Sequence, residues 1–302
     1  MTTHRFSRYS AGSLRSIAMK EFNLRETEIN KHYWSFIASS EHSAYRARKY
    51  QNVHKDAPTS RLFRASGADA PRIPSTVSKW LEANDDLKNW LRLSVLVSAA
   101  SNFEMFLGHV SRTALASDPF VRHGSSRAID GVSLLKGGLE LPYEDVIEGL
   151  TKGDWNSRES FLMRIFGVKI LIVHHRKGEL EEIRKIRNDF AHGFGRSISV
   201  PQPGFLSVSR SQSLSQDRLK RYLGLLSSVA KSIDRHLMGH HIGHYEMLCH
   251  YHRFEAELST SGVSVHKALK SDIYKSFGAT VTERFCRDLI RHYELCPIIG
   301  RI

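Results

Sequence analysis

Apolar residues recur along most of the chain every three or four positions, which is the spacing of helices with one buried face. This spacing predicts helices over residues 26–50, 77–116, 177–192, 215–238, 263–277 and 279–294. The helix over 77–116 could break at Asn84-Asp85-Asp86. Because no strand–helix–strand alternation accompanies these segments, the predicted fold class is all-α.

Two stretches interrupt the helical pattern. Residues 54–75 hold three of the eight prolines and are expected to form a linker. Residues 193–214 are rich in serine and proline and are expected to form a loop. Between the two lies a further helix over residues 154–168, which has Asn156 or Ser157 available as its N-cap.

The net positive charge of the chain indicates what kind of molecule it could bind. The 302 residues include 44 Lys and Arg against 31 Asp and Glu, a formal net charge of +13. Residues 1–75 contribute 13 of the basic and 6 of the acidic side chains, and the first residues are expected to form a mobile basic tail. A basic surface favours RNA or DNA, because it neutralises phosphates and releases counterions.

Cysteine usage and hydropathy bear on the compartment. The three cysteines, Cys249, Cys286 and Cys296, form no Cys-x-x-Cys pair, and their odd number argues against a disulfide scaffold. This pattern indicates a reducing cytoplasm. The longest apolar stretches fall short of the ~20 residues that span a bilayer, so we expect no membrane segment.

The helix over residues 177–192 places one charged residue where apolar residues should be. At about 100° per residue, its apolar positions form a single stripe. The stripe consists of Leu180, Ile183, Ile186, Phe190 and Ala191. Arg187 falls inside the stripe, whereas Asn188 and His192, four residues apart, lie together at its edge.

An arginine in an apolar stripe loses hydration unless something pairs with it. Glu104 occupies the corresponding place in the apolar face of the helix over 77–116. We therefore expect a Glu104–Arg187 ion pair. Such a pair could fix the register of the two helices or form part of a site.

The run Arg187-Asn188-x-x-x-His192 resembles the signature of the HEPN superfamily, in which Arg precedes His by four to six residues and a polar residue often follows the Arg. The surrounding helices are similar to HEPN proteins grouped with the RiboL-PSP ribonucleases. The resemblance covers about residues 77–240 and implies an up-and-down helical bundle. It divides the chain into a basic extension and linker (1–75), a bundle (76–240) and a helical C-terminal extension (241–302).

The resemblance also implies a chemistry. Active HEPN proteins are metal-independent endoribonucleases whose composite site forms at a homodimer interface. His192 would act as general acid or base, Arg187 would bind the phosphate, and Asn188 would orient His192 or the phosphate, with Glu104 in support. The 2′-OH of the RNA would attack the adjacent phosphate, so the products would carry a 2′,3′-cyclic phosphate and a 5′-OH. No cofactor or metal would take part. Phage defence or a toxin system is the implied setting, with a regulatory or antitoxin partner possible.

Two other interpretations stay open from the residues. The first is a non-catalytic RNA-binding or scaffold protein of the same fold. The second is a metal-dependent hydrolase built on the histidine-rich stretch 236–252. There His236, His240 and His244 follow one another at four-residue spacing, which would place them on one helix face together with Cys249 or Glu246.

Overall fold

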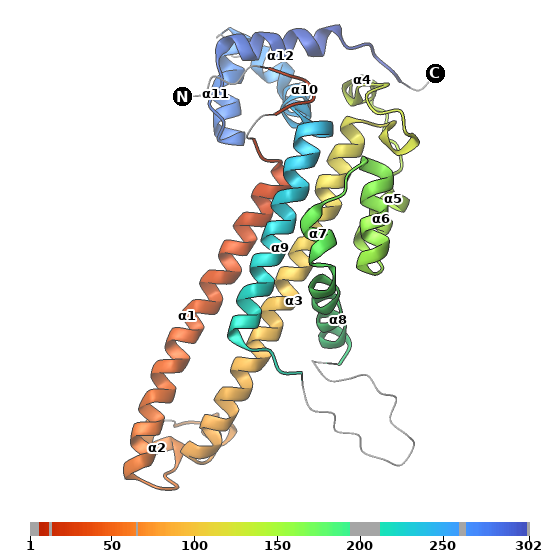
Figure 1. The fold of residues 1–302 in the computed structure, drawn as a ribbon. Helices are drawn as coiled ribbons and strands as arrows, with labels where there is room; N and C mark the ends of the chain where they lie inside the picture. The colour runs from red at the N-terminus through yellow and green to blue at the C-terminus, as the bar shows by residue number, and fades with distance from the viewer. Residues whose placement is uncertain (1–5, 12–13, 65, 194–211, 260–263, 301–302) are drawn as a thin grey trace. The chain divides into compact units, whose positions relative to one another are not determined.

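The computed structural model describes residues 6–11, 14–64, 66–193, 212–259 and 264–300 (Figure 1). These residues are mostly helical and contain no strand; Pro58 and Thr76 form an isolated antiparallel bridge. The predicted all-α class is therefore confirmed for the described part of the chain.

The α-helices differ widely in length. They are α1 (Ile17–Val53), α2 (Thr59–Phe63), α3 (Val77–Ser117), α4 (Gly131–Lys136), α5 (Glu144–Thr151), α6 (Trp155–Phe166), α7 (Leu171–His175), α8 (Lys177–Gly193), α9 (Gln216–Leu237), α10 (Tyr245–Ser259), α11 (Val265–Phe277) and α12 (Glu283–Leu295). Short turns η1 (Ala70–Arg72), η2 (Val121–His123) and the π-turn η3 (Met238–Ile242) connect some of them.

Several predicted boundaries need correction. The helix expected over 26–50 is the C-terminal part of the longer α1. The N-cap of α6 is Asp154, whose carboxylate accepts a hydrogen bond from the Ser157 N–H at 2.8 Å, and not Asn156 or Ser157. An ionised Asp satisfies a free N–H at the helix start and also complements its dipole, which explains the choice. The loop expected over 193–214 lies mostly outside the described residues.

The chain divides into two compact units, each assembled from separate segments. The first unit comprises residues 1–23, 103–181 and 226–302, and the second comprises residues 24–102 and 182–225. Helices α1, α3, α8 and α9 each contribute residues to both units. The division into 1–75, 76–240 and 241–302 concerns modules along the sequence, and it stays a prediction.

In the second unit, α3 continues without a break through the Asn84-Asp85-Asp86 run. The Asn84 side chain is buried, and its Oδ1 accepts a hydrogen bond from the Ser40 hydroxyl of α1 at 2.9 Å. A buried amide with a partner on a neighbouring helix stabilises the helical conformation that its intrinsic propensity disfavours.

The predicted linker in the second unit folds back on itself. The Val77 N–H donates to the Ala57 carbonyl and the Thr59 N–H to the Ser75 carbonyl, both at 3.1 Å. Val77, Ala57 and Ala47 form a small buried cluster. The linker therefore closes the connection between α1 and α3, and within it lie the short helix α2 and the turn η1.

In the first unit, α10 packs against α4, α11 and α12, and α11 packs against α12 (Figure 1). The α5 and α6 helices pack against each other. Residues 6–11, expected to belong to a mobile basic tail, pack against this unit through the buried Arg8 and Ala11. Arg8 is only 7% exposed, because it contacts α3, α4 and the π-turn. This part of the basic extension is thus structural.

One helix, α3, has an 18-residue segment that is apolar enough and long enough to cross a membrane. That segment is 56% buried inside the protein, as the segments of a core helix are. Packing of α3 inside the protein therefore accounts for the apolar residues of this segment.

Candidate functional site

The helix that carries the Arg187-Asn188-x-x-x-His192 run is amphipathic, as predicted. Leu180, Ile183 and Ile186 are buried on its apolar face, and Arg187 is partly buried beside them. The helix ends at Gly193, one residue after His192. The sequence thus places His192 in the last helical turn, and its side chain lies outside the described part of the chain.

Arg187 and Asn188 contact each other through their side chains. The Arg187 Nη1 donates a hydrogen bond to the Asn188 Oδ1 at 2.9 Å, in a partly buried setting. A guanidinium held by a neighbouring amide has fewer accessible rotamers, so its charge is presented in a more defined position. Asn188 precedes His192 by one helical turn, which keeps both on the same side of α8.

Two neighbouring helices anchor the part of α8 that belongs to the second unit. The Glu182 carboxylate accepts hydrogen bonds from Arg218 and from the Tyr222 hydroxyl of α9. On α3, the Trp90 ring contacts the Phe190 ring, with centroids 6.2 Å apart. The motif helix is therefore fixed against both α3 and α9 within this unit.

One partner of Glu104 is Arg158. The Arg158 Nη2 lies 3.1 Å from the Glu104 Oε1, and the Arg158 side chain is 4% exposed. Arg158 also stacks over the Trp155 ring at 5.3 Å. Glu104 belongs to the first unit and Arg187 to the second, so the expected Glu104–Arg187 pair stays a prediction.

Sequence analysis missed Arg158, although a signal was present. Arg158 lies three residues after Trp155 and four before Leu162, so all three share one face of α6. A charged side chain on that apolar face loses hydration unless a partner compensates it, as is also the case for Arg187 in α8.

The histidine-rich stretch does not form one helical face, because α9 ends at Leu237 and the chain turns at Gly243. Gly243 has a φ of 55°, and a Cβ at this position would lie 2.0 Å from the Arg8 carbonyl oxygen. Only glycine permits this close approach of the two backbone segments.

The histidines of the stretch consequently fall into separate groups, each with its own contacts. The rings of His236 and His240 stack on each other at 4.2 Å. The His241 Nδ1 lies 3.0 Å from the Oδ2 of the buried Asp118, and the His244 Nδ1 contacts the Ser7 backbone. A metal site in residues 236–252, the alternative that the histidine spacing left open, is therefore not assembled among the described residues.

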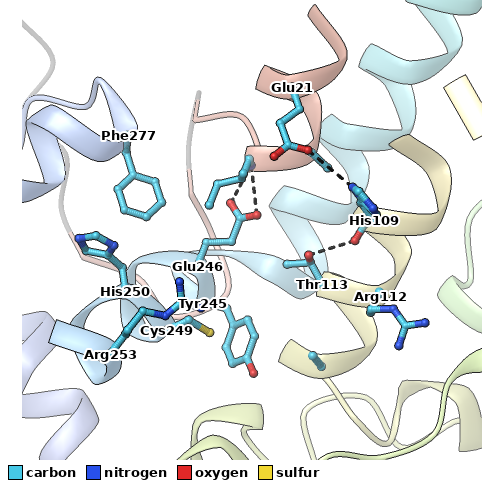
Figure 2. Close-up of a pocket in the computed structure, with 13 residues that line it drawn as sticks. Glu21, His109, Arg112, Thr113, Tyr245, Glu246, Cys249, His250, Arg253 and Phe277 are labelled. Atoms are coloured by element: carbon cyan, nitrogen blue, oxygen red, sulfur yellow. Dashed lines mark hydrogen bonds and ion pairs between the residues drawn. The ribbon is translucent and has the colours of Figure 1, made fainter. Parts of the chain in front are cut away.

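The first unit contains a pocket of about 530 Å³ between α1, α3, α10 and α11 (Figure 2). Glu246 lies on its wall, and both of its carboxylate oxygens accept hydrogen bonds from the Ile17 N–H at 3.0 and 3.1 Å. Burial raises the Glu246 pKa to about 7, although the hydrogen bond from Ile17 opposes the rise. Because Ile17 is the first residue of α1, Glu246 serves as the cap of that helix.

Other side chains of this pocket are unsuited to nucleophilic catalysis. Burial raises the pKa of the neighbouring Cys249 thiol to about 11, so it is protonated at neutral pH. His250 is engaged by Asp272, and Glu21 pairs with His109 at 3.6 Å. The pocket therefore has a structural explanation for its charged groups.

A second cluster of the first unit joins Arg8 to Asp130, His292 and Cys296. The Arg8 guanidinium donates to both Asp130 carboxylate oxygens at 2.7–2.9 Å, and the His292 Nε2 lies 2.9 Å from the Asp130 Oδ2. Burial alone would raise the pKa of Asp130, but the hydrogen bonds from His292 and Arg8 outweigh it and hold the value at about 2. Among the described residues, Asp130, His292 and Cys296 are the group whose ligand atoms come close enough together to hold a metal ion.

No protein-family model, curated protein or solved structure matches this chain.

Proposed function

We propose that this chain is a metal-independent endoribonuclease of the HEPN type. The observation that carries the proposal is the Arg187–Asn188 hydrogen bond, which lies in the last turns of α8 immediately before His192. It brings a phosphate-binding cation and an orienting amide together one turn from a general acid–base residue. The net charge of +13 supports a polyanionic substrate.

Each motif residue has a distinct role in this proposal. Arg187 binds the scissile phosphate and stabilises the charge that develops on it. His192 moves protons, because an imidazole with an ordinary pKa of about 6.5 exchanges them near neutrality. Asn188 holds the guanidinium. The RNA 2′-OH attacks the adjacent phosphorus, so the products carry a 2′,3′-cyclic phosphate and a 5′-OH.

A second copy of the chain completes the site. Arg187 and His192 are five positions apart in the helix, so the two positions diverge by about 140° around the α8 axis. One helix alone therefore focuses them poorly on a single phosphate. Trp90, which contacts Phe190 of the motif helix, is 47% exposed. A homodimer that covers this aromatic pair would bring two motif helices together.

The setting that fits this activity is the cytoplasm, where RNA is accessible. A nuclease of this kind acts in phage defence or as a toxin, and a host cell requires some restraint on it, such as a regulatory or antitoxin partner. The up-and-down arrangement of HEPN bundles is part of the same proposal.

Incubation of RNA with the purified full chain in EDTA tests the activity. We expect the wild type to cut, and Arg187→Ala and His192→Ala to lose cutting. Lys185→Ala is the matched control, because it removes an exposed positive charge from the same helix. Circular dichroism shows whether each variant is folded.

The ends of the products test the mechanism. Fragments with a 5′-OH accept phosphate from a polynucleotide kinase without prior phosphatase treatment, and RNA with a 2′-deoxy sugar at the cut site resists cleavage. If wild type binds RNA but leaves it intact, the chain is a non-catalytic scaffold. Equal cutting by wild type and His192→Ala would exclude the proposed site.

A further inference from the structure

The cluster of Asp130, His292 and Cys296 brings three metal-ligand types together from separate parts of the first unit. Asp130 is the N-cap of α4, and its carboxylate accepts a hydrogen bond from the Val132 N–H at 3.0 Å. His292 lies in the last turn of α12, and Cys296 is the C-cap residue of that helix. Because His292 and Cys296 are four residues apart, their side chains project to the same side.

The donor atoms have the spacing that a tetrahedral ion requires. The Asp130 Oδ2 lies 2.9 Å from the His292 Nε2 and 4.0 Å from the Cys296 Sγ. The His292 Nε2 and the Cys296 Sγ are 3.5 Å apart. Zinc bonds of about 2.0–2.3 Å at tetrahedral angles separate donor atoms by roughly 3.3–3.6 Å. The three separations bracket this range, so small side-chain movements suffice to place an ion.

The surroundings hold the cluster in position. The Asp130 carboxylate is fixed by Arg8, which donates to both of its oxygens, and by the Val132 N–H, which donates to Oδ1. The Lys136 Nζ donates to the Cys296 carbonyl at 2.7 Å. Groups of this kind orient ligands in metal sites and support metal affinity.

A cavity gives an ion access to the cluster. Its volume is about 350 Å³, and all three side chains line it together with residues such as Ile129, Ser133, Leu295 and Ile299. Three protein ligands and an adjacent cavity leave the fourth tetrahedral position open to water or a small ligand.

We propose that Asp130, His292 and Cys296 bind a thiophilic divalent cation, zinc in the first place. A thiolate, an imidazole and a carboxylate form a mixed ligand set that suits zinc and disfavours magnesium and calcium. The Cys296 thiol releases its proton to solvent on binding, and neutral His292 keeps its one ring proton on Nδ1. The negative charges of the carboxylate and the thiolate then offset those of the ion, and the neighbouring Arg8 guanidinium leaves the cluster with one net positive charge.

A nucleophilic Cys-His-Asp triad fits the geometry less well. In such a triad the histidine takes the thiol proton with one ring nitrogen while the carboxylate orients the other. Here Cys296 and Asp130 both approach the Nε2 of His292. One nitrogen cannot serve both roles, whereas a single ion can replace the hydrogens that lie between these three groups.

Metal titration of the full chain tests the proposal without any measurement of RNA cleavage. The purified protein is stripped with a chelator, dialysed and loaded with Zn²⁺, and we expect one ion per chain. Loading with Co²⁺ should give a near-ultraviolet thiolate-to-cobalt charge-transfer band. Cys296→Ser should abolish this band and weaken Zn²⁺ binding by more than the roughly 10- to 100-fold that orienting partners contribute.

Cys249→Ser is the matched control, because Cys249 lines a different pocket of the same unit. This variant should retain the band and the stoichiometry. His292→Gln removes another of the proposed ligands but leaves every thiol in place, so it should also lose metal binding. Circular dichroism checks whether this variant is folded. Wild type without stoichiometric binding, or an equally strong band in Cys296→Ser, would overturn the proposal.

Discussion

Arg8 donates hydrogen bonds to both carboxylate oxygens of Asp130, which lies 122 residues further along the chain. The Arg8 side chain is 6% exposed and that of Asp130 is 15% exposed. The same guanidinium also donates to the Ser117 and Ile242 carbonyls. One cation thereby satisfies acceptors from α4, α3 and the π-turn between α9 and α10.

Replacement of Arg8 by Gln should strongly destabilise the first unit. Loss of one partner leaves the other charge of a buried pair uncompensated, which costs roughly 3–5 kcal/mol. Chemical denaturation followed by circular dichroism measures the loss. Arg48→Gln removes an exposed positive charge and should stay within about 0.5 kcal/mol of wild type. Similar stabilities for the two variants would show that Arg8 is not essential to the core.

Gly243→Ala should destabilise the protein by overpacking. The new Cβ would lie 2.0 Å from the Arg8 carbonyl oxygen, and the φ of 55° already disfavours a side chain. Overpacking alone costs about 1–3 kcal/mol. Gly239→Ala has nothing within 4 Å of its new Cβ and should be neutral or slightly stabilising. A shift in the thermal midpoint that is the same for both variants would contradict this reasoning.

The stability of the protein should depend on pH through Glu246. Burial raises its folded-state pKa from 4.5 to about 7, so the folded state binds this proton more tightly than the unfolded state. This contribution is fully present below pH 4.5 and is lost as the pH rises through 7. Relative to Glu246→Gln, wild type should lose on the order of 3 kcal/mol across that interval.

Denaturant titrations at several pH values measure this difference. The groups that surround the Glu246 carboxyl include Asp234 and Glu21, which raise its pKa, and Lys20, which lowers it. Glu21→Gln removes one of the charges that raise this pKa, so it should move the pH-dependent loss of stability slightly to lower pH without abolishing it. A stability difference between wild type and Glu246→Gln that does not vary with pH would refute the assignment.

Glu104 and Arg158 should be energetically coupled. A double-mutant cycle with Glu104→Gln and Arg158→Met should give a coupling free energy of about 0.5–3 kcal/mol, since the Arg158 side chain is 4% exposed. Additive effects would mean that the pair contributes nothing to stability. The same cycle with Arg187→Met tests the Glu104–Arg187 pair that the helix faces predict.

Arg187→Lys should separate charge from geometry in the proposed nuclease. Lysine keeps the positive charge but lacks the planar fork that contacts Asn188 and a phosphate together. RNA binding, measured by gel shift, should stay close to wild type, while the cleavage rate should fall by roughly 10²–10³-fold. A rate equal to that of wild type would show that only the charge is required.

Helical periodicity predicted most of the fold because the apolar faces of the long helices are regular. The buried stripe of α8 and the extent of α3 follow directly from it. The sequence could not show that Asn84 accepts a hydrogen bond from Ser40, or that Arg8 is buried. Each of these features depends on a partner that is distant along the chain. Non-local partners override local preference in such cases.

The same limit applies to the candidate sites. Arg187 and Asn188 are adjacent, so local sequence was sufficient to single out both residues, although not the hydrogen bond between them. The Asp130 cluster was not visible in the sequence, because His292 and Cys296 are only two residues at helical spacing and Asp130 lies 162 residues from His292. The histidine-rich stretch was misleading for the opposite reason: its regular spacing suggested one face, and the turn at Gly243 disperses it.

The cluster around Asp130 also sets the order in which the protein can mature during translation. Arg8, Asp130 and His292 leave the ribosome at widely separated times, yet they share one carboxylate. The first unit therefore completes its core only after α12 has emerged from the exit tunnel. Until then the nascent chain exposes apolar surface that the finished core covers, and surface of this kind is prone to aggregation.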